Sequence, residues 1–111
     1  MHIIHRVAEF QLGRVDLVAN DQYLQCAAIA LYENQTFKAH KHIEVKKQTT
    51  IAQESWTIVK GRVMAIFYDL DDTEIIQVEL TQGDCSITLK GGHNYKALEP
   101  SLVYEYKTGP Y

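Results

Sequence analysis

Two histidines lie one residue apart in the segment FKAHKHIEV. Side chains at positions i and i+2 of a strand point to the same face. A strand here would therefore place His40 and His42 on one face, about 7 Å apart along the strand. Two imidazoles at that spacing can bind the same metal ion, so the pair predicts a metal site if further ligands lie nearby.

A carboxylate begins the next segment, ESWTIVKG, which alternates like a half-buried strand. Glu54, Trp56 and Ile58 share one face of that strand, and the two apolar side chains mark it as the inward face. A buried, unpaired carboxylate is costly, so Glu54 is expected to have a cationic partner or to bind a metal. A further histidine, His93, follows a glycine pair after another strand-like segment.

Period-two alternation of apolar residues also dominates the rest of the chain. Strand-like segments include YLQCAAIALYE, EIIQVEL, CSITL and SLVYEYK, and turn-forming clusters such as DLDDTE, TQGD and KGGHN separate them. The alanine-rich CAAIALY is ambiguous between helix and strand, and we expect a strand. About eight or nine short strands at this spacing indicate an all-β sandwich, jelly roll or barrel.

Length and charge limit the classes of protein to consider. The 111 residues suit a single domain over 1–111, and the net charge of −3 comes with scattered basic residues, which disfavours nucleic acid or an acidic membrane as a partner. The longest apolar run, AAIALY, is far shorter than the ~20 residues that cross a bilayer, and no signal-peptide core is evident. We expect a cytoplasmic protein in which Cys26 and Cys85 are small buried hydrophobes.

The chemistry-bearing residues are spaced in a way that resembles the two motifs of the cupin superfamily. The first motif has an HxH pair, then a glutamate, then a glycine after six further residues; here Glu54 is followed after six intervening residues by Gly61. The second motif runs from a glycine to a histidine at a turn, here from Gly83 to His93.

The resemblance covers residues 37–95 and implies a cupin-type double-stranded β-helix, or jelly roll. It also implies one divalent metal ion, Fe, Mn, Ni or Zn, with four ligands: His40, His42, Glu54 and His93. Eleven residues separate His42 from Glu54, where the family usually has three or four, so Glu44 stays open as the alternative carboxylate ligand.

The segments from QESW to LVYEYKTGPY are similar to those of small cupins associated with bacterial surface-polysaccharide and unusual-sugar biosynthesis. This similarity implies a sugar-related setting without naming a reaction. Three imidazoles and one carboxylate would leave open positions on the ion for a substrate, so the first hypothesis is a metal-dependent enzyme, an isomerase or oxygenase, acting on a small polar or sugar-derived molecule. The family resemblance also implies a homodimer. Two alternatives stay open: a metal-free sugar-nucleotide isomerase or epimerase, and a non-catalytic sugar- or metal-binding module. The residues expected to line the pocket are Trp56, Lys38, Tyr95 and Tyr104.

Overall fold

The computed structural model describes residues 1–37, 40–41 and 52–110, and for residues 40 and 41 the backbone alone. A single 3-10 turn, η1 (Val7–Glu9), precedes the strands in this part of the chain. The strands are β1 (Gly13–Asp16), β2 (Leu24–Leu31), β3 (His40–Lys41), β4 (Glu54–Lys60), β5 (Arg62–Tyr68), β6 (Glu74–Thr81), β7 (Cys85–Thr88), β8 (Gly92–Ala97) and β9 (Ser101–Thr108). The all-β prediction is confirmed, and the alanine-rich segment is a strand.

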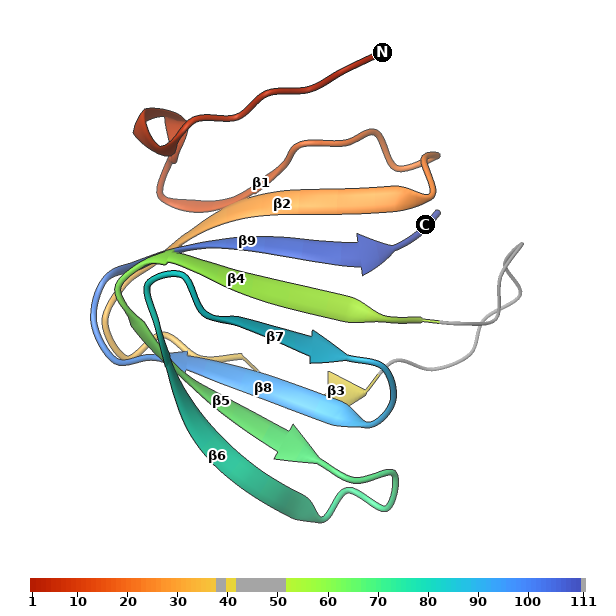
Figure 1. Ribbon diagram of the computed structural model, residues 1–111, viewed down its shortest axis with the longest axis vertical. Coiled ribbons are helices and arrows are strands. Elements are labelled where there is room, and N and C mark those ends of the chain that lie inside the picture. Colours follow the sequence, from red (N-terminus) through yellow and green to blue (C-terminus); the bar gives the residue numbers. More distant parts are fainter. Residues whose placement is uncertain (38–39, 42–51, 111) are drawn as a thin grey trace.

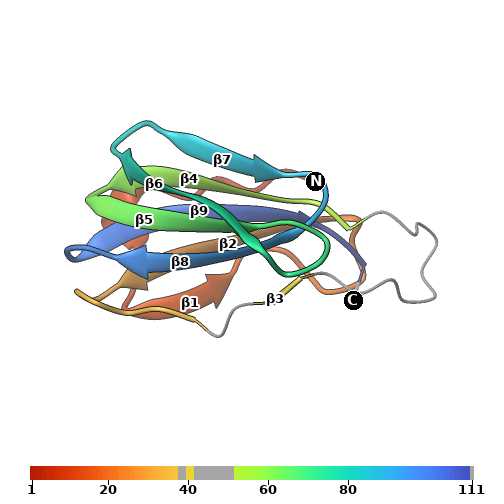
Figure 2. The same ribbon diagram turned by 90° about the horizontal axis from the view of Figure 1, so that it is seen from below.

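The strands form two antiparallel sheets that face each other (Figure 1 and Figure 2). One sheet has the order β1-β2-β9-β4-β7 and the other has the order β3-β8-β5-β6. From β2 onward the chain passes repeatedly from one sheet to the other, with the hairpin β5–β6 as the exception, in a jelly-roll arrangement.

Apolar side chains at alternate positions of the strands fill the space between the sheets. Ile58 of β4, Val63 of β5 and Val103 of β9 have no exposed surface, and they meet at one end of the sandwich. Burying three such side chains removes apolar surface from water, at roughly 1.5–3 kcal/mol for each. The two cysteines do not belong to this core, since Cys85 is exposed and Cys26 is half-buried; the prediction that both are buried is wrong because both sit on strand faces that point away from it.

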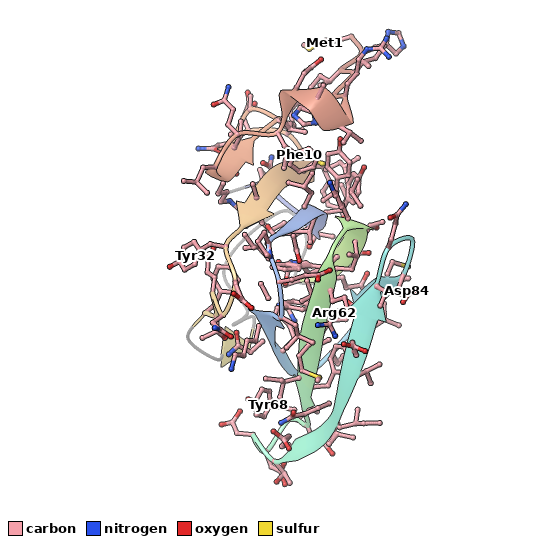
Figure 3. The ribbon with its side chains drawn as sticks, turned by 90° about the vertical axis from the view of Figure 1, so that its left-hand side faces the viewer. Met1, Phe10, Tyr32, Arg62, Tyr68 and Asp84 are labelled. Carbon is pink, nitrogen blue, oxygen red and sulfur yellow. The ribbon has the colours of Figure 1, made fainter. Side chains whose placement is uncertain are left out.

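The N-terminal segment covers part of the outer face of the larger sheet. Nδ1 of His5 lies 2.8 Å from the hydroxyl of Tyr104, and the rings of Phe10 and Tyr104 are 5.1 Å apart. Figure 3 labels Met1 and Phe10 along this segment, well away from the hairpin that Arg62 and Tyr68 mark. No helix in the described residues is long and apolar enough to span a membrane.

Gly61 forms the tight turn between β4 and β5. Its φ is +100°, and a Cβ there would lie 2.8 Å from the carbonyl oxygen of Pro100 and 2.8 Å from Cα of Ser101. Gly83, in the turn before β7, also has a positive φ of +89°, but a Cβ there would meet nothing within 4 Å. The two glycines of the sequence motifs therefore differ. Both adopt a left-handed backbone conformation that favours glycine, but only at Gly61 is there no room for a side chain.

We expect Gly61→Ala to reduce the free energy of unfolding more than Gly83→Ala does. Both substitutions incur the backbone strain of about 1–2 kcal/mol, and Gly61→Ala adds a clash with backbone atoms that cannot move aside cheaply. Urea unfolding of the two variants and the wild type measures the difference. Equal reductions in the free energy of unfolding would show that the backbone at Pro100 and Ser101 shifts to accommodate the added methyl group without destabilising the fold.

Candidate functional site

A cavity of about 250 Å³ opens between the two sheets, and its wall includes the buried polar residues Glu54, His93, Asn94 and Glu105. Its lining residues are Arg14, Ile29, Phe37, Glu54, Trp56, His93, Asn94, Tyr95, Glu105 and Lys107. A larger cavity of about 700 Å³ lies on the outer face under the N-terminal segment, lined mainly by apolar residues such as Ile3, Ile4 and Leu24. The ionisable groups that could do chemistry together lie in the smaller cavity.

Glu54 and His93 meet in this cavity from opposite sheets. Glu54 is the first residue of β4, His93 is the second of β8, and Oε2 of Glu54 contacts Nε2 of His93. Both side chains are buried, at 6% and 1% exposure. The inward direction of Glu54 was predicted from the alternation with Trp56 and Ile58, and His93 is the group that it meets there.

His40 lies next to this pair in the backbone register. β3 pairs with β8 so that His40 is directly opposite His93. His42, Glu44 and Lys38 lie outside the described residues, so the choice between the two carboxylates stays a prediction. Among the side chains that the structure describes, in 1–37 and 52–110, no three of His, Cys, Asp or Glu gather as a metal cluster.

The donors that do meet suit a metal ion. A carboxylate oxygen and an imidazole nitrogen are ligands that Fe, Mn, Ni and Zn all accept. The pairing of β3 with β8 also places a second histidine, His40, opposite His93. The residues present therefore fit the group that the sequence motifs imply.

An aromatic wall closes one side of the cavity. The rings of Trp56 and Tyr95 stack with centroids 3.9 Å apart and planes 5° apart, and Phe37 meets Trp56 edge-on at 5.8 Å. The Tyr95 hydroxyl lies 2.7 Å from Oγ of Ser86, and burial raises the pKa of Tyr95 above its usual value. Tyr95 therefore keeps its proton at neutral pH and holds its hydroxyl against β7.

A second buried carboxylate, Glu105, lies beside this wall. Nε1 of Trp56 donates a hydrogen bond to its Oε2 at 3.2 Å, and Nη2 of Arg14 donates one to its Oε1 at 2.6 Å. Nζ of Lys107 is 3.3 Å from Oε1. Groups from three strands therefore surround one carboxylate, and the cations Arg14 and Lys107 neutralise its charge; 7% of the Glu105 side chain is exposed.

Arg14 reaches Glu105 across the intervening strand β2. Ala27 of β2 is the register partner of Glu105 and is almost fully buried, and its small side chain leaves room above it. The hydrogen bond to Glu105 raises the pKa of the Arg14 guanidinium above its usual value. Arg14, Glu105 and Lys107 were not predicted as site residues; the signal for Glu105 was its two-residue spacing from Val103 and Lys107 in LVYEYK.

Neither a scan against protein-family models nor a search of curated proteins finds a match to this sequence. Solved structures do match. KdgF from Halomonas sp. is 19% identical with a TM-score of 0.68, over 88% of this chain and 77% of that chain. A cupin superfamily protein from Desulfitobacterium hafniense is 13% identical with a TM-score of 0.68, over 96% and 83%. An RmlC-like cupin protein from Desulfovibrio desulfuricans is 10% identical with a TM-score of 0.67, over 97% and 96%.

The chain has the cupin fold. The resemblance drawn from the spacing of the motif residues is thus confirmed for the jelly roll. Similarity at these identities concerns the fold, so the ligand and the reaction of this chain have to be inferred from its own residues.

Tyr104 does not line the inner cavity, contrary to its place among the predicted pocket residues. Val103 and Glu105 face inward, so Tyr104 between them faces outward, where it contacts His5 and lines the larger outer cavity. Burial there raises its pKa. Trp56 and Tyr95 do line the inner cavity.

We expect Glu105→Gln to destabilise the fold by about 2 kcal/mol. The variant keeps an acceptor for Trp56 but removes the charge that compensates Arg14 and Lys107, and hydrogen bonds to charged groups contribute about 1.5–3 kcal/mol each. Glu99→Gln is the matched control, since Glu99 pairs with Arg62 at 3.7 Å with nearly half of each side chain exposed, where ion pairs contribute at most about 1 kcal/mol. Urea unfolding compares them, and equal losses would contradict a structural role for Glu105.

Proposed function

We propose that this chain is a metal-binding cupin that acts on a small polar, sugar-derived molecule as an enzyme of carbohydrate metabolism. One observation carries the proposal: Glu54 and His93 meet inside a cavity, with His40 opposite His93 in the register. These are three of the four residues whose spacing resembles the cupin ligand set. An ordinary core would place apolar side chains at such positions.

The chain's own residues would hold the ion as follows. Nε2 of His93 and the carboxylate of Glu54 face each other at the cavity wall and would be two ligands. His40 and His42 would complete the set. A bound divalent ion supplies Lewis-acid polarisation of a coordinated oxygen, and Trp56, Tyr95 and Phe37 exclude water from one side of the site.

The size of the cavity supports a small substrate. Its volume of about 250 Å³ lies below the ~300–1,000 Å³ of pockets that enclose drug-sized ligands. A molecule of monosaccharide size suits this space, whereas a sugar nucleotide would extend well beyond it. The polar groups on the wall can meet hydroxyl groups of such a molecule.

The same geometry disfavours the metal-free isomerase or epimerase. That mechanism needs a tyrosine hydroxyl that returns a proton to the substrate. The hydroxyl of Tyr95 is engaged with Ser86, and Tyr104 lies on the outer face. A non-catalytic binding module would bind its ligand in the same cavity without converting it. A measurement of whether the bound molecule is consumed therefore distinguishes a module from an enzyme.

A homodimer and a cytoplasmic location stay predictions from the sequence. Size-exclusion chromatography with light scattering measures the first. Fractionation of cells that produce the protein from its own gene measures the second.

We expect the wild-type protein, purified without a metal-binding affinity tag, to contain a first-row divalent metal by elemental analysis. Adding Mn(II), Fe(II), Ni(II) or Zn(II) to metal-free protein should raise its melting temperature, on the order of 10 °C at saturating metal. His93→Ala should remove the shift because it removes a ligand. His2→Ala is the control, since His2 is exposed at the N-terminus, and it should retain the full shift.

A wild type that shows neither bound metal nor a thermal shift with any of these ions would refute the metal site. Glu54→Gln and Glu44→Gln then identify the carboxylate: loss of metal in the first variant alone supports Glu54, and loss in the second alone assigns Glu44. Neither substitution changes the length of the side chain, so the comparison isolates the charge.

A further inference from the structure

The wall of the cavity carries two cationic side chains, Arg14 and Lys107, that a metal site does not need. We infer that the molecule bound in this cavity carries a carboxylate, and that Arg14 binds it. This inference rests on the proposed function in taking the cavity as the substrate site. It adds the charge of the substrate and the residue that recognises it.

Glu105 fixes the position of Arg14. The hydrogen bond from Nη2 to Glu105 is 2.6 Å long, and the one from Nε to Asp16 is 2.9 Å long. Glu105 is itself held by Trp56 of the aromatic wall. A guanidinium fixed at two of its nitrogens loses little further freedom when it binds a ligand, which favours recognition.

Arg14 has donors left for a ligand. Its third nitrogen, Nη1, makes no hydrogen bond to any residue that the structure describes, and it carries two N–H groups. The side chain is 38% exposed, so a ligand can reach it from solvent. Guanidinium N–H groups match the oxygens of a carboxylate in geometry and charge.

The charges in this cluster are balanced, so a net positive charge is not what would attract an anion to Arg14. Glu105 and Asp16 offset the charges of Arg14 and Lys107 within the same cluster. The selectivity for an anion comes from a guanidinium that Glu105 and Asp16 hold at the cavity wall, in a partly desolvated site where hydrogen bonds are stronger than in water.

The spacing of the acidic groups along the cavity wall sets the scale of the ligand. Glu105 is opposite Trp56 in the register, and Glu54 lies two residues from Trp56 on the same face. Such diagonal neighbours are about 7–8 Å apart. A hydroxy acid of about six carbons can place its carboxylate at Arg14 and its hydroxyl groups at Glu54 and His93.

Gluconate and sorbitol form a matched pair of probes, because they share a hydroxylated six-carbon chain and differ at one end, a carboxylate against a CH2OH group. Isothermal titration of metal-free wild-type protein should show gluconate binding at least tenfold more tightly than sorbitol. Arg14→Met should abolish this preference and leave sorbitol binding and the metal-induced thermal shift unchanged. Arg62→Met is the control: Arg62 also pairs with two glutamates and is 47% exposed, but it lies outside the cavity, so the preference should persist.

Equal binding of gluconate and sorbitol by the wild type would overturn the inference, whatever the variants do. A preference that survives Arg14→Met in folded protein would overturn the role of Arg14. If Arg14→Met fails to fold, Arg14→Lys keeps the charge, and a weakened preference in it supports recognition by the guanidinium, whereas an unchanged one contradicts it. Because these titrations use metal-free protein, their outcome is separate from that of the metal tests.

Discussion

The burial of Glu54 is the constraint on which the polar half of this sandwich depends. A carboxylate between two packed sheets costs several kcal/mol unless a partner compensates it. Nε2 of His93 reaches it from the opposite sheet, so one contact joins β4 to β8. Sheets packed about 10 Å apart leave room for a pair of medium-sized polar side chains between them. The cavity lies around this pair because the two side chains do not fill the space as large apolar residues would.

The interior is divided along the strands into an apolar end and a polar end. Ile58 and Val103 are register partners on β4 and β9 and belong to the apolar core. Toward the other end of the same two strands, Trp56 pairs with Glu105 and then Glu54 pairs with Lys107. At each successive inward-facing pair along the two strands, polar or charged side chains thus take the place of apolar ones. The apolar end provides the stability that allows charged groups to be held in place at the other end.

Local patterns predicted the strands and the inward direction of Glu54, since Trp56 and Ile58 mark that face. The sequence did not give the direction of Tyr104 on β9, which was expected to line the inner pocket and lines the outer cavity instead. Tyr104 packs under the N-terminal segment, so both faces of β9 are covered and alternation does not distinguish them. The contacts of His93 with Glu54 and of Arg14 with Glu105 depend on sheet packing and on register between distant segments. No local pattern encodes those.

The two buried carboxylates differ in what surrounds them, and the difference separates their roles. Glu105 accepts hydrogen bonds from an indole and a guanidinium and forms an ion pair with an ammonium group, so its charge is neutralised by two cations, and it orients Arg14. Glu54 instead contacts an imidazole, a group that is itself a metal ligand. The two side chains therefore already lie together in the structure. A metal ion bound there would replace the direct contact between Glu54 and His93 with a shared bond to the ion, at a place where the fold has already brought both side chains together.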